Sequence, residues 1–234
     1  MSGYDRQQLV EAIETGQPVE GEDLRGLDLS GLDLGGANLR GSDLRNANLL
    51  ETNLEEAHLE RVNLEGAVLH KTNFTGAHLS GITLKDVDLS SCIMTRVTAL
   101  DSQFLRITLS GQDLSRSKLT GSTIIYSRLK DLNLSEAGLQ KMKVLFTTLE
   151  SCTLDKCALN ESDFALSRFT KITMNDSDLT LVSFMAASMQ DIQMRNAILD
   201  RVDFTLINAE GLDITGAKQH GLVMERAKVR NLTR

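Results

Sequence analysis

The sequence predicts an all-β fold in which the chain coils and turns after every five residues. Every fifth residue from Leu24 to Val229 is a centre of this pattern, and only Gln219 among these 42 residues is polar. The residue two positions before each centre is small or β-branched with few exceptions, and the other three positions are mostly polar. Neither the 3.6-residue period of a helix nor the two-residue period of a strand produces this pattern. It therefore predicts a coil that turns after each five-residue side, with two inward-looking positions on each side.

The residues before the repeats are predicted to form one short helix. Residues 4–15 are amphipathic, with Leu9, Val10 and Ile13 on one face. Gly16 fits a C-terminal cap, and Pro18 prevents the helix from continuing. Because the end of a solenoid exposes its core and unpaired strand groups, we expect this helix to cap the first coil. We therefore assign residues 1–20 to a helical cap and residues 21–234 to the β-helix.

The five-residue unit resembles the repeat of the pentapeptide repeat family. That repeat reads small residue, Asp or Asn, Leu or Phe, and two further residues, as ANLRG and ANLLE do here. The resemblance extends over nearly the whole chain without an insertion. It implies a right-handed quadrilateral parallel β-helix with four repeats, or 20 residues, in each of about ten coils. It also implies that the centre and the residue two before it both point inward.

Turn residues recur at the second position after each centre. Gly26, Gly76 and Gly121 are among the glycines found there, as expected for a type II turn with a positive φ at that position. No glycine occupies this position from Tyr126 to Leu206. Another type of turn is therefore predicted in the middle of the rod.

Composition and charge exclude several classes of protein. The chain has 25 basic and 32 acidic residues, a net charge of −7, so we expect no direct binding of nucleic-acid phosphates. No apolar run is long enough to span a membrane, and the start MSGYDRQQLVEAIE lacks the features of a signal peptide. Three cysteines at irregular spacing provide no disulfide framework. We expect a cytoplasmic protein.

Residues for catalysis or cofactor binding are not apparent. Cys92, Cys152 and Cys157 all occupy the small inward position, which predicts buried thiols. His58 and His78 are 20 residues apart and should stack at about 5 Å on adjacent coils, but two ligands make a poor metal site. The glycines follow the turn period, so none forms a phosphate-binding loop. We expect no enzymatic activity, no cofactor and no functional metal.

One face of the predicted β-helix carries large apolar residues at positions that should point into water. On the face that begins with Leu24, the two residues after the centre are apolar in several successive coils, whereas elsewhere these positions are mostly polar. We name as the apolar stripe Leu105, Ile125, Tyr126, Leu145, Phe146, Leu166, Met185 and Leu206. We expect it to contact a protein partner or a second copy, with Tyr126 and Phe146 as anchors. The alternative is that these side chains fold against their own neighbours.

The C-terminal end is a second candidate for a contact between two copies. The repeats continue in phase to VRNLTR with no predicted cap. The inward positions of this last part are Leu222, Met224, Val229 and Leu232. Arg226, Lys228, Arg230 and Arg234 lie among them, and the other interpretation is that these basic residues keep an open edge soluble.

Two functions follow from the resemblance. Some family members mimic DNA, bind type II topoisomerases and protect them from quinolones, with a strongly acidic face and a C-terminal dimerisation helix. Residues 21–100 here mix 12 acidic with seven basic side chains, and neither that helix nor a loop is predicted. The start IETGQPVEGEDLRGLDLSGLDL resembles short repeat proteins that accompany bacterial secretion systems, including type VI effector loading. We favour a non-enzymatic interaction scaffold that presents the apolar stripe to an effector, an adaptor or itself, with the topoisomerase binder as the alternative.

Overall fold

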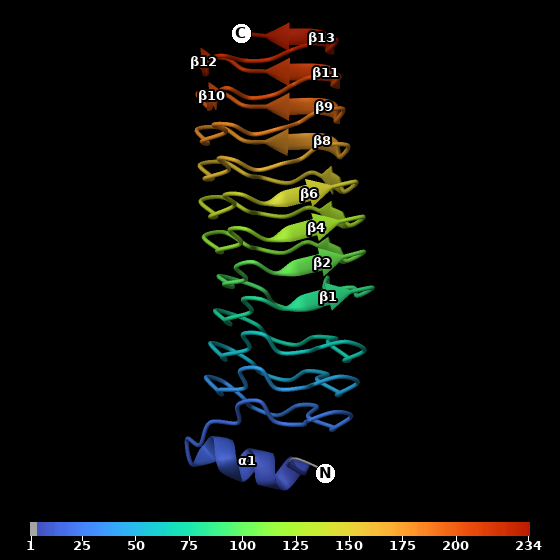
Figure 1. The fold of residues 1–234 in the computed structure, drawn as a ribbon, viewed down its shortest axis with the longest axis vertical. Helices are drawn as coiled ribbons and strands as arrows, with labels where there is room; N and C mark the ends of the chain where they lie inside the picture. The colour runs from blue at the N-terminus through green and yellow to red at the C-terminus, as the bar shows by residue number, and fades with distance from the viewer. Residues whose placement is uncertain (1–3) are drawn as a thin grey trace.

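A computed structural model describes residues 4–234, which form a long rod with a helix across its N-terminal end (Figure 1). Parallel bridges join residues 20 apart, and the ladder that starts at Asp23 climbs in ten such steps to Val223. Three further ladders start at Asp28, Asp33 and Asn38, so each coil has four sides of five residues. Two bridges are missing from the regular series, those of Val68 with Asp88 and of Ile93 with Asp113. The predicted register is confirmed.

The longest regular strands lie in the C-terminal two thirds of the rod. The parallel sheets have the orders β1-β2-β4-β6, β10-β12 and β13-β11-β9-β8-β7-β5-β3. Their strands are β1 (Thr83–Lys85), β2 (Gln103–Leu105), β3 (Thr108–Ser110), β4 (Thr123–Ile125), β5 (Arg128–Lys130), β6 (Lys143–Leu145), β7 (Thr148–Glu150), β8 (Arg168–Thr173), β9 (Ser188–Gln193), β10 (Ile198–Asp200), β11 (Asn208–Asp213), β12 (Lys218–His220) and β13 (Lys228–Thr233).

The helix α1 (Arg6–Glu14) has both ends capped. Asp5 and Gln8 form a capping box, in which each side chain accepts a hydrogen bond from the backbone N–H of the other residue. At the other end Gly16 has a positive φ, and the N–H groups of Gly16 and Gln17 donate to carbonyls of the last turn. This bonding is that of a Schellman motif, so the predicted glycine cap is confirmed.

The buried face of α1 differs by one residue from the prediction. Leu9 and Ala12 are buried, and Ile13 packs against the core at its margin. The prediction that Val10 belongs to the buried face is wrong, because Val10 is not among the residues that pack against the core, and Ala12 is buried in its place. Val10 stays partly exposed beside the face that Leu9, Ala12 and Ile13 form.

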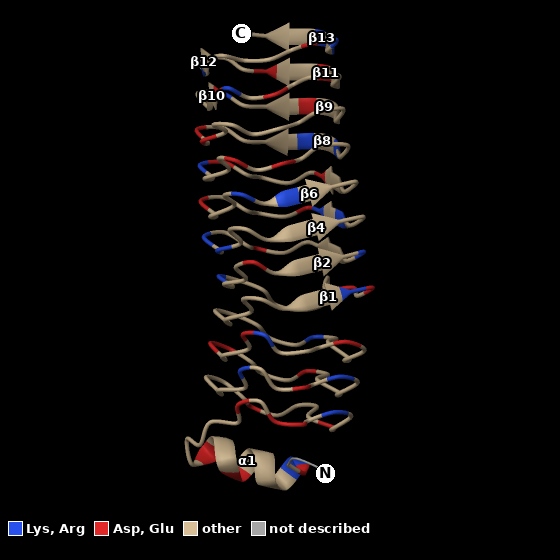
Figure 2. Ribbon diagram, viewed as in Figure 1, with Lys and Arg blue, Asp and Glu red and all other residues tan. Residues whose placement is uncertain are grey.

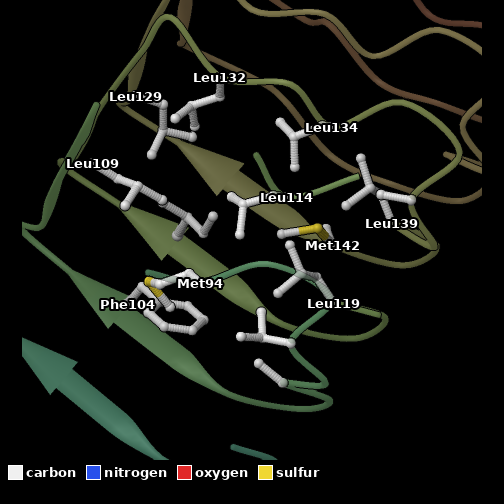
Figure 3. Packing of buried hydrophobic residues seen from close by; sticks show 14 of the residues in the cluster. Met94, Phe104, Leu109, Leu114, Leu119, Leu129, Leu132, Leu134, Leu139 and Met142 are labelled. Atoms are coloured by element: carbon white, nitrogen blue, oxygen red, sulfur yellow. The ribbon is translucent and has the colours of Figure 1, made fainter. Parts of the chain in front are cut away.

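The interior of the rod is filled by the predicted centres. Every centre from Leu24 to Ile214 is buried (Figure 3 shows part of this core). Phe164, Phe184 and Phe204 form a stacked column with successive ring centroids 5.4 and 5.5 Å apart. Such offset stacking adds to the burial of apolar area. A continuous column of side chains therefore holds the coils together from within.

Polar atoms at the small inward position are bonded to the coil below. The hydroxyls of Thr52 and Ser162 donate to the carbonyls of the residues 23 positions earlier, at 2.9 and 2.7 Å. The Cys157 thiol makes the same contact with the carbonyl oxygen of Leu134 at 2.9 Å. Most buried hydroxyls and thiols are tolerated here because they find a backbone acceptor, whereas the buried Ser117 hydroxyl has no hydrogen-bond partner. The three cysteines are buried and unpaired, as predicted.

The Asp or Asn before many centres joins turns within and between coils. The carboxylate of Asp113 accepts from the Ser115 N–H and from the side-chain amide of Asn133, both at 3.0 Å. Asp28 and Asn48 make the equivalent amide-to-carboxylate contact at 2.9 Å. These residues have a structural task, which explains their regular spacing.

The corners keep one backbone conformation along most of the rod, with or without glycine. The second residue after the centre has a positive φ at every corner from Tyr126 to Leu206, although none is glycine. The prediction of another type of turn in the middle of the rod is therefore wrong as regards the backbone conformation, which stays the same. At Leu181 the turn bond from the Val182 N–H to the Leu179 carbonyl is also retained. Only the hydrogen bonding differs, and only at certain corners. At the Tyr126 corner, for example, the Ser127 N–H donates to the Thr147 hydroxyl on the next coil instead of closing the turn.

Within residues 4–234, no helix is both long enough and apolar enough to cross a membrane.

Candidate protein-interaction surface

The apolar stripe begins on the strands of one sheet. Residues Leu105, Ile125 and Leu145 end β2, β4 and β6 and lie in register, one above the other. The stripe spans five coil steps from Leu105 to the level of Leu206, or about 24 Å at the usual strand spacing. Figure 2 shows β2 and β4 without charged residues. The coil therefore places on one face residues that are up to 101 positions apart in the sequence, from Leu105 to Leu206.

Five of the eight stripe residues are well exposed. Their exposed fractions are 58% for Tyr126, 50% for Leu166, 48% for Leu206, 46% for Phe146 and 42% for Met185. Leu105, Ile125 and Leu145 are only half-buried, so for these three the alternative of packing against neighbours applies in part. The exposed members occupy successive levels, and a row of this kind differs from scattered surface leucines.

Tyr126 and Phe146 are the first two members of the exposed row and its aromatic ones. Their rings stack with centroids 5.0 Å apart and an interplanar angle of 21°. Both residues have a left-handed backbone, with φ of 54° and 52°. Their corners are braced by hydroxyls, since the N–H groups of Ser127 and Thr147 donate to Thr147 and Ser167. The two rings are thus presented by a fixed backbone, which reduces the ordering cost of binding.

Ion pairs lie on both sides of the stripe. Lys130 pairs with Glu150 at 3.5 Å on one side, and Lys141 pairs with Glu161 at 3.7 Å on the other. The N-terminal end is bounded by Arg106, whose guanidinium makes two hydrogen bonds to Asp86. These hydrogen bonds hold the pKa of the Asp86 carboxyl below its ordinary value. An apolar centre with a charged, internally compensated rim has the anatomy of a protein interface.

The residues suggested for a C-terminal edge contact lie together on the last coil. Leu222, Met224, Val229 and Leu232 are partly buried and pack against the end of the core. Most equivalent inward residues of earlier coils are buried, with Glu22, Leu32 and Gln112 as exceptions. This arrangement agrees with the assigned inward positions, and whether a second copy contacts them stays a prediction.

Several exposed apolar residues were not identified from the sequence. Val68, Ile93, Ile198 and Val223 each stand directly before a centre, where Asp, Asn or Thr is common. They could have been identified from the sequence, because each is an apolar residue at a position that is usually polar. They are spread over different faces and do not form a continuous row with the stripe.

Known proteins are similar to this chain in both repeat sequence and fold. The family model for pentapeptide repeats matches eight copies within residues 23–61 and 52–90. The crystal structure of HetL is similar over 97% of this chain and 95% of that chain, with 20% identity and a TM-score of 0.54. HetL is a pentapeptide repeat protein involved in regulation of heterocyst differentiation in the cyanobacterium Nostoc sp. strain PCC 7120. This similarity confirms the predicted fold class, a right-handed quadrilateral parallel β-helix with a short helix.

Two further solved structures match with lower TM-scores. Trypsin-treated QnrB1, a plasmid-mediated fluoroquinolone resistance protein, is 15% identical over 89% of this chain and 92% of its own, with a TM-score of 0.37. A pentapeptide repeat protein from the thylakoid lumen of Arabidopsis thaliana is 25% identical over 53% of this chain and 69% of its own, with a TM-score of 0.25. No curated protein sequence matches the chain significantly.

Proposed function

This chain is a pentapeptide repeat protein, and we propose that it is a non-enzymatic interaction module that presents the apolar stripe to another protein or to a second copy of itself. The observation that carries the proposal is the row of exposed apolar side chains from Tyr126 to Leu206. Exposing such a row to water is unfavourable unless a partner covers it. Solenoids present extended surfaces of this kind because their repeats stack along one axis.

Binding energy is expected to concentrate at the stacked pair. Tyr126 and Phe146 are the aromatic members of the stripe, lie next to each other and are exposed. Central aromatic residues contribute most to many interfaces, whereas the ionic rim contributes to orientation and specificity. A secretion effector or an adaptor is the partner that the N-terminal sequence resemblance implies, and the stripe is the surface that would receive it.

The topoisomerase alternative has less support in the surface charges. A DNA mimic needs a row of acidic groups that are not neutralised by the protein itself. Here Asp43 lies 2.5 Å from the Arg45 guanidinium, and Glu51 lies 2.8 Å from the Lys71 ammonium group. Pairs of this kind recur along the rod, so much of its acidic charge is compensated locally.

The test compares the wild type with the double variant Tyr126→Asp/Phe146→Asp and with Leu181→Asp as the matched control. Leu181 is exposed to a similar degree but lies outside the stripe. Light scattering gives the mass of each, and circular dichroism checks the fold. A wild-type dimer that becomes monomeric only in the double variant supports self-association through the stripe.

A monomeric wild type directs the test to a foreign partner. Capture of the same protein by wild type and Leu181→Asp, but not by the double variant, then supports the proposal. Equal capture by all three, or a dimer that persists in all three, contradicts it. Inhibition of DNA supercoiling by a type II topoisomerase, unchanged in the double variant, would favour the alternative.

A further inference from the structure

A cluster of potential metal ligands lies on a face other than that of the stripe. His58 and His78 are bridged partners on adjacent coils, and their rings stack at 4.8 Å with an interplanar angle of 23°. Glu60 follows His58 by two residues and joins the pair. One ligand atom from each of the three lies within 4.8 Å of the other two. The sequence pattern identified the two histidines but not Glu60 as the third ligand.

The Glu60 carboxylate has one oxygen without a hydrogen-bond partner of good geometry. Its Oε2 atom is buried and accepts no hydrogen bond of good geometry, although the Arg40 Nε atom approaches to 3.1 Å. Its Oε1 atom lies 3.6 Å from Nδ1 of His58. A buried carboxylate oxygen without a hydrogen bond is uncommon, because losing water without a replacement partner costs free energy. This oxygen is therefore suited to accept a cation.

Arg40 now provides the positive charge at the cluster. Its guanidinium donates to Nδ1 of His58 at 2.6 Å and to Oε1 of Glu60 at 3.3 Å. It also has a second acidic neighbour, since Nη1 lies 3.8 Å from the Glu20 carboxylate. Arg40 can therefore move toward Glu20 if another cation takes its place. The Arg40 guanidinium therefore competes with a metal ion for these ligands but does not block the site permanently.

We propose that His58, Glu60 and His78 bind a divalent transition-metal ion, with Zn²⁺ as the reference ion. Two imidazoles and one carboxylate form a common donor set for zinc, and a fourth position remains for water or another ligand. Zinc–nitrogen distances of about 2.1 Å require ligand atoms about 3.4 Å apart, so the side chains must close inward by about 1 Å. All three are partly exposed and have room to rotate. Binding displaces the Arg40 guanidinium from His58 and Glu60.

Calorimetric titration of the full chain with Zn²⁺ tests the proposal. We expect one saturable site in the wild type. His78→Ala should weaken it about tenfold or more, because one of three protein ligands is lost. Arg40→Gln should bind more tightly than the wild type, because the competing cation is gone. His70→Ala removes a histidine outside the cluster and should bind like the wild type.

Thermal unfolding provides a second readout that does not depend on the heat of binding. Zn²⁺ should raise the unfolding temperature of the wild type and His70→Ala, and should raise that of His78→Ala much less. The proposal is overturned by a wild type without a saturable site, or by equal affinity in wild type and His78→Ala. It is also overturned if Arg40→Gln binds more weakly than the wild type while it remains folded.

Discussion

The Tyr126 and Phe146 rings stack in water-accessible positions, with centroids 5.0 Å apart, on residues 20 positions apart in the chain. The 20-residue coil places them one above the other, and their left-handed corners point both rings away from the core. Stacking covers part of each ring and still leaves about half of each side chain exposed. The same pair is thus a local stabilising contact and the proposed anchor for a partner.

Stacking predicts measurable coupling between the two residues. In a double-mutant cycle with Tyr126→Ala and Phe146→Ala, the interaction should contribute about 0.5–1 kcal/mol to the free energy of unfolding. Urea unfolding of the four proteins measures it. A coupling of zero would mean that the rings do not stack in solution. Tyr126→Ala combined with Leu206→Ala, four coil levels away, is the control and should be additive.

Phe184 lies in the middle of the buried phenylalanine column and should be among the most sensitive core positions. It is fully buried between Phe164 and Phe204. Phe184→Ala should destabilise the fold by about 3–5 kcal/mol, because it removes a large side chain and leaves a cavity. Phe184→Leu should cost less, since leucine is the usual residue at the centres. Equal midpoints for the wild type and Phe184→Ala in urea unfolding would contradict this packing.

The corner conformation predicts opposite effects at two exposed positions. Gly26 has a φ of 67° and no atom within 4 Å of an added Cβ, so Gly26→Ala should cost about 1–2 kcal/mol through backbone conformation alone. Leu181 has a φ of 60° without being glycine, and Leu181→Gly should be neutral or stabilising by up to about 1 kcal/mol. Urea unfolding of both variants checks the signs. Strong destabilisation by Leu181→Gly would show that its side chain matters more than its backbone.

The buried cysteines should be inert in the folded protein. Burial raises the pKa of the Cys92 and Cys157 thiols to about 12, and that of Cys152 to about 11. A thiol reagent at mildly alkaline pH should therefore label none of the three before unfolding and all three in urea. Fast labelling of the native protein would show that the rod opens locally near these residues.

Acid should weaken the turns that carboxylates hold. The pKa of Asp213 is lowered to about 2, first by the Thr215 hydroxyl, then by the Thr215 N–H and the Arg195 guanidinium. A lowered pKa stabilises the folded state above the unfolded value of about 4, and this contribution is lost as the pH falls from about 4 to about 2. Asp213→Asn should lose less stability than the wild type over that interval. If the urea midpoints of the wild type and Asp213→Asn fell in parallel as the pH is lowered, the ionised Asp213 carboxylate would not stabilise the turn.

The period of five and the choice of residues at each position determined most of the fold. A leucine-rich centre every fifth residue cannot be buried by a helix or a single strand, so the coil and its core followed from the period. The 20-residue register was implied by the resemblance of the repeat to the pentapeptide repeat family. The stacking of His58 on His78 was predictable for the same reason, since identical positions on adjacent coils must lie one strand spacing apart. The placement of the apolar stripe on one face followed as well.

The tertiary structure decided what the period does not specify, namely how far each side chain is buried by its neighbours and which backbone conformation each corner adopts. Packing selected Ala12 rather than Val10 for the buried face of α1 and half-covered Leu105, Ile125 and Leu145 within the stripe. It also holds residues such as Leu181 in a conformation that favours glycine, because every corner must match those above and below it. The approach of Arg40 and Glu60 to the stacked histidines depends on side-chain rotation, which a repeat pattern leaves open.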